Sequence, residues 1–149
     1  MKMKRFLSLI LAMVMSLALA APAFAAEDGD PNEGIMPLAQ LYSDNNINAN
    51  SDTYKPTFTT TPGAGKYLRV WFRNKGAESV VVTLWDYNTR ERLTSKTFIP
   101  NDPNDTFLYT ISAPDKACSF YLTFQSIGDS NARVIGQAAA AQHATRPSN

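Results

Sequence analysis

Beyond position 35, short runs of hydrophobic and β-branched residues alternate with clusters of Gly, Pro, Asn, Asp and Ser, and no run shows a sustained helical period. The runs predict strands at residues 35–42, 53–60, 67–73, 79–87, 92–99, 106–112, 118–127 and 132–141. Seven or eight short antiparallel strands at this spacing indicate an all-β fold, a single β-sandwich. Jelly-roll and immunoglobulin-like connectivities both fit the pattern.

Two of these strands carry further positional information. Pro56 removes a backbone donor from its strand, so we expect that strand at a sheet edge or a bulge. Residues 118–127 show the cleanest alternation, with a buried face of Phe120, Leu122 and Phe124 and an outward face of Ser119, Tyr121, Thr123 and Gln125. Cys118 begins the same inward series, and we expect its thiol to act as a small apolar side chain.

The strands at 67–73 and 79–87 are predicted to form a β-hairpin closed by residues 74–78, with Gly76 free to adopt positive φ. A symmetric loop would place Trp71 opposite Val81 and Tyr67 opposite Trp85. One face of this hairpin would be wholly apolar and fill the core; its residues are Leu68, Val70, Phe72, Val80, Val82 and Leu84.

The other face of the predicted hairpin would point outward with an unusual set of side chains, namely Tyr67, Arg69, Trp71, Arg73, Trp85 and Tyr87. Exposed aromatic patches on soluble domains tend to be interaction sites, and planar rings suit the apolar faces of sugars. We therefore predict a glycan-binding platform here. Two alternatives remain. Trp71 or Trp85 is the buried core tryptophan of an immunoglobulin-like sandwich, with another strand or loop covering the other rings, or the patch is a subunit interface.

The first 25 residues indicate export. Lys2, Lys4 and Arg5 precede an apolar run at residues 6–20, and residues 23–25 have the small-x-small pattern of a cleavage site. This predicts a signal peptide at 1–25, a disordered acidic leader at 26–34, a β-sandwich domain at 35–142 and a flexible tail at 143–149. The apolar run is too short to span a bilayer, so we expect a secreted, extracellular protein without a membrane anchor after cleavage.

Charge and cysteine content narrow the function classes. Three of the 14 basic residues and none of the 13 acidic ones lie in the first 25 positions, so the remaining 124 residues carry 11 basic residues and a net charge of −2. A mildly acidic domain without a basic stripe is a poor nucleic-acid binder. Cys118 is the only cysteine, which excludes an internal disulfide and, for an exported chain, suggests a bacterial source.

The residue types do not favour catalysis. His143 is the only histidine and falls in the predicted tail, where we expect it to be solvated, so a catalytic triad or zinc site is not indicated. Asp86 and Glu91 flank a turn near the aromatic face and are the one carboxylate pair considered for glycoside hydrolysis, but exposed turn acids usually only solvate a loop. We expect no enzyme activity.

A structural calcium ion is the one cofactor for which the sequence offers suitable ligands. Oxygen-bearing side chains crowd one turn at Asp102, Asn104 and Asp105. An ordinary Asp/Asn turn explains the same residues and is the favoured interpretation. We therefore predict no metal and no cofactor, with calcium at this turn as the alternative.

The domain resembles small β-sandwich modules of secreted bacterial proteins, including carbohydrate-binding modules and pre-peptidase-type domains. The resemblance lies in the spacing of the predicted strands, the aromatic residues of the predicted hairpin and the closing segments at 121–124 and 134–136. No sequence motif contributes to the resemblance. It implies a non-catalytic binding module, with carbohydrate or cell-wall glycan as the leading ligand class. The alternative is an extracellular structural or adhesion subunit that acts through protein association; its oligomeric state is left open.

Overall fold

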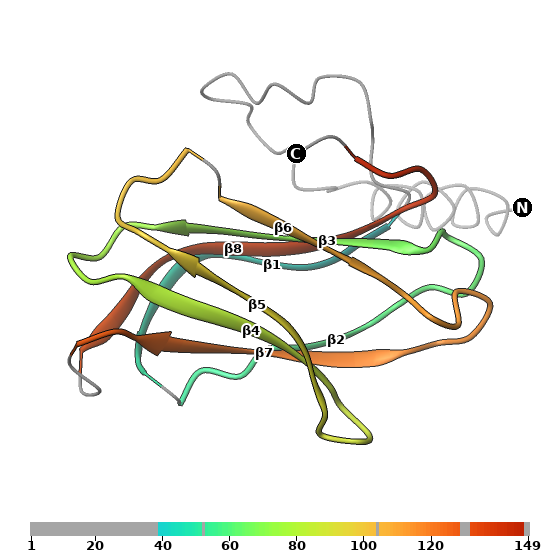
Figure 1. Cartoon of the computed structure of the whole chain (residues 1–149), viewed down its shortest axis with the longest axis horizontal. Coiled ribbons are helices and arrows are strands. Elements are labelled where there is room, and N and C mark those ends of the chain that lie inside the picture. Colours follow the sequence, from blue (N-terminus) through green and yellow to red (C-terminus); the bar gives the residue numbers. More distant parts are fainter. Residues whose placement is uncertain (1–38, 52, 104, 129–131, 148–149) are drawn as a thin grey trace, which may run out of the picture. The chain divides into compact units, whose positions relative to one another are not determined.

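The computed structural model describes residues 39–51, 53–103, 105–128 and 132–147. Eight strands lie in this part of the chain: β1 (Ala39–Asn50), β2 (Thr57–Thr59), β3 (Tyr67–Asn74), β4 (Val80–Asp86), β5 (Arg92–Phe98), β6 (Thr106–Thr110), β7 (Ser119–Ser126) and β8 (Arg133–His143). They form two four-stranded antiparallel sheets, sheet A in the order β1-β8-β3-β6 and sheet B in the order β2-β7-β4-β5 (Figure 1). The all-β prediction is confirmed.

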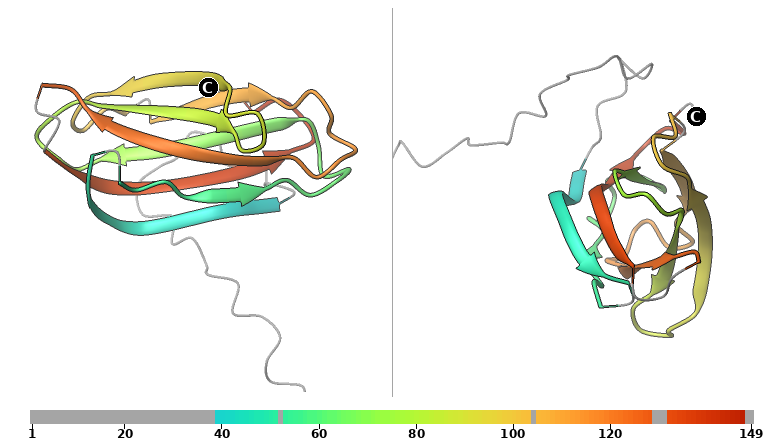
Figure 2. Two further views of the ribbon diagram at one scale, coloured as in Figure 1. Left: turned by 90° about the horizontal axis from the view of Figure 1, so that it is seen from below. Right: turned by 90° about the vertical axis from the view of Figure 1, so that its left-hand side faces the viewer.

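The order of the strands decides between the two connectivities that the sequence left open. β4 and β5 are the only consecutive strands that lie in the same sheet among the described residues, and every other connection crosses from one sheet to the other. This order, with two interleaved Greek keys, is that of a jelly roll. The sheets lie one over the other as two layers (Figure 2).

One core fills the space between the layers. The inward residues of β3 and β4 that the sequence analysis named are buried, with relative exposures of 2% or less. Phe72 sits at the centre, with its ring centroid 5.5 Å from that of Phe98 and 5.2 Å from that of Phe124. Gly136 on β8 lies against this ring and the Arg73 backbone, because an added Cβ would lie 2.8 Å from Phe72 Cε2 and 2.4 Å from the Arg73 carbonyl oxygen, which explains the small residue there.

The predicted hairpin is wrong. β3 belongs to sheet A, where it pairs with β6 and β8, whereas β4 belongs to sheet B, where it pairs with β5 and β7. Residues 74–78 therefore cross between the sheets, and Gly76 does not have positive φ. Asn74 holds this crossover: its Nδ2 donates to the carbonyls of Glu78 at 2.8 Å and Phe98 at 3.0 Å, and its Oδ1 accepts from the Gly76 amide at 3.0 Å.

The first strand is longer than predicted. Residues 43–50, expected as a polar connection, continue β1 along the edge of sheet A. Register shifts between Gln40 and Tyr42 and between Asp44 and Ile47 break the alternation on which the prediction depended. β2 is shorter than predicted but lies at the edge of sheet B, as Pro56 indicated.

Polar contacts close both open sides of the sandwich. On the β5/β6 side, Lys96 Nζ donates to the Thr106 carbonyl at 2.9 Å. On the β1/β2 side, the Tyr54 hydroxyl donates to Asp44 and contacts the Tyr42 hydroxyl. Burial raises the pKa of Tyr42 to about 12, and burial followed by the hydrogen bond to Asp44 raises the pKa of Tyr54 well above its ordinary value.

This tyrosine pair predicts a loss of stability in alkali. Both phenols hold their protons more tightly in the folded chain than in the unfolded chain, where tyrosine titrates near pH 10. Their contribution to the free energy of unfolding is complete below about pH 10. It is lost as the pH rises toward about 12, because the unfolded chain then releases protons that the folded chain retains. Urea unfolding at pH 8 to 11.5 measures the effect.

The double variant Tyr42→Phe/Tyr54→Phe isolates the pair from the lysines that titrate in the same range. We expect its unfolding free energy to fall less steeply with pH than that of the wild type. Tyr87→Phe removes an exposed phenol outside the network and serves as the control. Equal slopes for the wild type and the double variant would contradict the assignment.

Some predictions lie outside the described residues. The signal peptide at 1–25 and the leader at 26–34 do, and they stay predictions.

His143, expected in a solvated tail, is instead the last residue of β8 and is 3% exposed, so that expectation is wrong. Burial, with a smaller effect of Arg69, lowers the pKa of its imidazole. No helix in the described part of the chain is long and apolar enough to cross a membrane.

Candidate functional site

The predicted aromatic platform does not form a single surface. Its residues all point away from the core, as expected, but the change of sheet between β3 and β4 places them on opposite sides of the molecule. Tyr67, Arg69, Trp71 and Arg73 lie on the outer face of sheet A. Trp85 and the following Tyr87 lie on the outer side of sheet B.

On sheet A, the half-buried Trp71 is engaged with neighbours. The Arg73 guanidinium lies 5.4 Å from the centre of its ring, and Arg73 Nε lies 3.9 Å from Asp105 Oδ2. Burial raises the pKa of Asp105, against the opposing effects of a hydrogen bond from Trp71 and the charge of Arg73. Trp71 therefore belongs to a cluster of mutually paired side chains.

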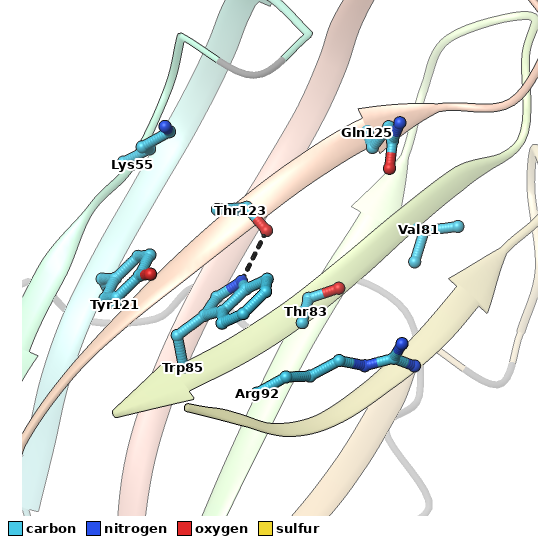
Figure 3. Close-up of a pocket in the computed structure, with 8 residues that line it drawn as sticks. All are labelled: Lys55, Val81, Thr83, Trp85, Arg92, Tyr121, Thr123 and Gln125. Atoms are coloured by element: carbon cyan, nitrogen blue, oxygen red, sulfur yellow. Dashed lines mark hydrogen bonds between the residues drawn. The ribbon is translucent and has the colours of Figure 1, made fainter. Parts of the chain in front are cut away.

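On sheet B, the outer face is hollowed around Trp85. The hollow has a volume of about 400 Å³ and is lined by residues of β4, β5, β7 and the segment before β2, namely Lys55, Val81, Thr83, Trp85, Arg92, Tyr121, Thr123 and Gln125 (Figure 3). Every strand of the sheet thus borders or adjoins it. The lining combines two aromatic rings with hydroxyl, amide and cationic groups and includes no carboxylate.

The two rings are held in place by the pairing of β4 with β7. Trp85 is directly opposite Tyr121 in the register, and the two ring planes lie within 7° of each other with centroids 5.9 Å apart. The indole Nε1 donates to Thr123 Oγ1 at 2.9 Å, as Figure 3 shows. Tyr87 packs edge-on against Tyr121 with a centroid distance of 6.4 Å. These contacts hold the rings in one cluster that is still partly exposed.

The turn between β4 and β5 adds a cation beside these rings. Asp86 Oδ1 accepts from the amides of Asn88 and Thr89, both at 2.8 Å, and the Thr89 amide is the main cause of the lowered pKa of Asp86. Arg90 adopts a left-handed conformation with φ of 62° in this turn. Its guanidinium lies 4.8 Å from the centre of the Tyr87 ring and 5.4 Å from that of Tyr121.

Asp86 thus organises a turn, and neither it nor Glu91 lines the hollow. In the calcium turn, Asn104 lies outside the described residues, and the Asp105 carboxylate faces Arg73. The prediction of no cofactor, with calcium at this turn as its alternative, stays untested. Among the described residues, no group of three or more His, Cys, Asp and Glu side chains is arranged to hold a metal ion.

Sequence reasoning identified Trp85 and Tyr87 and missed most residues around them. It placed Tyr121, Thr123 and Gln125 on an outward face, but it could not connect them with Trp85 without knowing that β4 pairs with β7. The signal available for Tyr121 was its position between Ser119 and Thr123 on the outward face of the strand with the clearest alternation. The sequence did not identify Lys55 as a site residue, because residues 53–60 are predicted as one strand, whereas β2 begins only at Thr57.

Comparison with known proteins adds little to these observations. No protein-family model matches the sequence, and no characterised protein is similar to it at a significant level. Among solved structures, part of the chain matches a Clostridium thermocellum endo-1,4-β-D-xylanase structure comprising CBM22-1 and GH10 modules in complex with xylohexaose, with 12% sequence identity and a TM-score of 0.34. The match covers 74% of this chain and only 29% of that one, and a likeness at this level carries no argument about fold or function.

Proposed function

We propose that this protein is an exported, non-catalytic carbohydrate-binding module that holds glycan in the hollow on the outer face of sheet B. The parallel ring pair of Trp85 and Tyr121 supports this proposal most directly. Sugar rings present apolar C–H faces that pack on indole and phenol rings, and a site of this kind needs only a few polar groups to orient the ligand. Thr83 and Gln125 supply such groups beside the rings.

The arrangement also supports binding in preference to hydrolysis. Glycoside hydrolysis requires two carboxyl groups on either side of the scissile bond. The hollow is lined by none, and the Asp86 carboxylate, the nearest along β4, accepts backbone hydrogen bonds in the turn. Export to the extracellular space forms part of the proposal because of the signal-like first 25 residues.

Removal of the indole tests the proposal. We expect Trp85→Ala to weaken binding about tenfold or more to each polysaccharide that the wild-type protein binds. The reason is that stacking and apolar contact of one aromatic ring contribute on the order of 1–3 kcal/mol. Affinity electrophoresis against a panel of plant and bacterial polysaccharides, followed by calorimetry, measures the loss. Circular dichroism checks that the variant is folded.

Trp71→Ala is the matched control, since it makes the same substitution on the opposite sheet. We expect it to retain the wild-type affinity. Glycan binding that survives Trp85→Ala but not Trp71→Ala would move the site to sheet A and refute the assignment to sheet B.

One observation favours the second candidate, an extracellular structural or adhesion subunit. Three isoleucines are exposed at or next to positions hydrogen-bonded to the segment that joins β3 and β4, and they are Ile99, Ile127 and Ile135, with exposures of 54%, 47% and 40%. Backbone hydrogen bonds join the last two to Ser79 and Lys75 of the crossover. Exposed apolar side chains of this kind suit association. A concentration-dependent oligomer in size-exclusion chromatography that Ile127→Ser dissociates would favour this candidate.

A further inference from the structure

We propose that the glycan held on sheet B is acidic, a polysaccharide whose sugars carry carboxylates, and that Lys55 and Arg92 bind those carboxylates. This inference rests on the proposed function and names its ligand class. It is carried by the charge distribution of the hollow, which has a cation on either side of the aromatic pair and no carboxylate in its lining (Figure 3).

The position of Lys55 is set by its neighbours in the chain. Tyr54 turns inward to hydrogen-bond Asp44 and pack on Phe124, so the next side chain points to the outer side of sheet B. Pro56 restricts the backbone of the preceding residue to extended conformations. Lys55 is exposed and forms no ion pair with any described residue, so its ammonium can pair with a ligand.

Arg92 occupies the opposite edge of the sheet. It pairs with Trp85 in the register, next to a β-bulge, and its Nη2 donates to Ser95 Oγ at 2.5 Å. This contact directs the guanidinium along β5 toward the hollow, as Figure 3 shows, and leaves other N–H groups for a ligand. Guanidinium groups bind carboxylates through two parallel hydrogen bonds, which gives both affinity and orientation.

The spacing of the two cations fits a polymer. Lys55 precedes β2 and Arg92 lies on β5, so three strand spacings, about 14 Å, separate their backbones. A single sugar over Trp85 does not reach both edges, whereas an oligosaccharide that crosses the strands places charged sugars on either side of the stacked one. The local excess of positive charge contrasts with the net charge of −2 that remains after the first 25 residues.

The experiment compares ligands that differ only in carrying a carboxylate or a neutral hydroxymethyl group on the same sugar. Polygalacturonate, alginate and glucuronoxylan are each tested beside their carboxyl-reduced, neutral counterparts by calorimetry and affinity electrophoresis. We expect at least one acidic polymer to bind about tenfold or more tightly than its reduced form, because hydrogen bonds between a cation and a carboxylate are stronger than those to a hydroxyl group. Added NaCl weakens binding of the acidic form by screening.

Charge-removing variants then locate the contacts. We expect Lys55→Gln and Arg92→Gln each to weaken binding of the acidic polymer about tenfold, and to weaken binding of the reduced polymer by a smaller factor. Lys75→Gln is the matched control, since it removes the same charge from an exposed residue of the β3–β4 crossover. Its affinity for the acidic polymer should equal that of the wild type.

The outcomes separate the two proposals. Equal binding of the acidic and reduced polymers, abolished by Trp85→Ala, would overturn the acidic-ligand inference and keep the carbohydrate-binding function. An equal loss in Lys75→Gln, or equal binding of poly-glutamate, would show a general attraction to polyanions and would also overturn it. Binding to no polysaccharide, acidic or neutral, counts against both.

Discussion

Replacement of Phe72 by alanine is expected to lower the free energy of unfolding by about 3–5 kcal/mol, which is the usual cost of removing a fully buried phenylalanine ring. Phe72 has no exposed surface and packs edge-on against Phe98 and Phe124 of the other sheet. Close contact with Gly136 on the neighbouring strand leaves little freedom for the backbone to collapse into the cavity. The variant thus loses both apolar contact and packing between the sheets.

Urea unfolding followed by far-UV circular dichroism measures this change at constant pH and temperature. Ile135→Ala is the control, because Ile135 lies on the same sheet but is 40% exposed. We expect it to change stability by less than about 1 kcal/mol. A Phe72→Ala variant as stable as this control would contradict the packing of the two sheets on one core.

Asn74→Ala is expected to cost about 2–4 kcal/mol, although Asn74 is a polar residue next to a loop. Its side chain is 3% exposed and forms three hydrogen bonds that hold the crossover between β3 and β4. Alanine leaves the Phe98 carbonyl and the Gly76 amide without these partners. Unpaired polar groups that remain away from water carry a penalty that a surface loop would not incur.

The same unfolding measurement, with hydrogen exchange of the Gly76 amide, tests this prediction. Lys75→Ala changes the adjacent exposed side chain and should leave both stability and exchange near wild-type values. A flexible hairpin loop at residues 74–78 would instead make the two variants alike. The comparison therefore distinguishes a crossover from the hairpin that the sequence suggested.

The contrast between β3 and β4 shows how far sequence reasoning reached. Alternation correctly assigned Leu68 and Val70 to the core and Trp71 and Trp85 to the outside. The same alternation arises whether two successive strands are neighbours in one sheet or face each other across a core, because both arrangements bury one side of each strand. A five-residue connection fits either case, so the predicted platform combined residues from opposite faces.

The candidate site depended even more on long-range pairing. Trp85 and Tyr121 are 36 positions apart in the sequence, and only the antiparallel register of β4 and β7 places their rings together. Arg92 joins them through the pairing of β4 with β5. Sequence periodicity reports which face a side chain occupies, but it has no information on which distant strand supplies the neighbour.

The sequence by itself determined the class of fold, the approximate position of seven of the strands and the inward or outward direction of their side chains, because these follow from local alternation and turn chemistry. The tertiary structure decided the jelly-roll order, the strand character of residues 43–50, and the burial of His143. It also decided which aromatic and cationic side chains share the outer face of sheet B. Those outcomes depend on contacts between segments that are distant in the sequence, and local alternation carries no information on which distant segments pair.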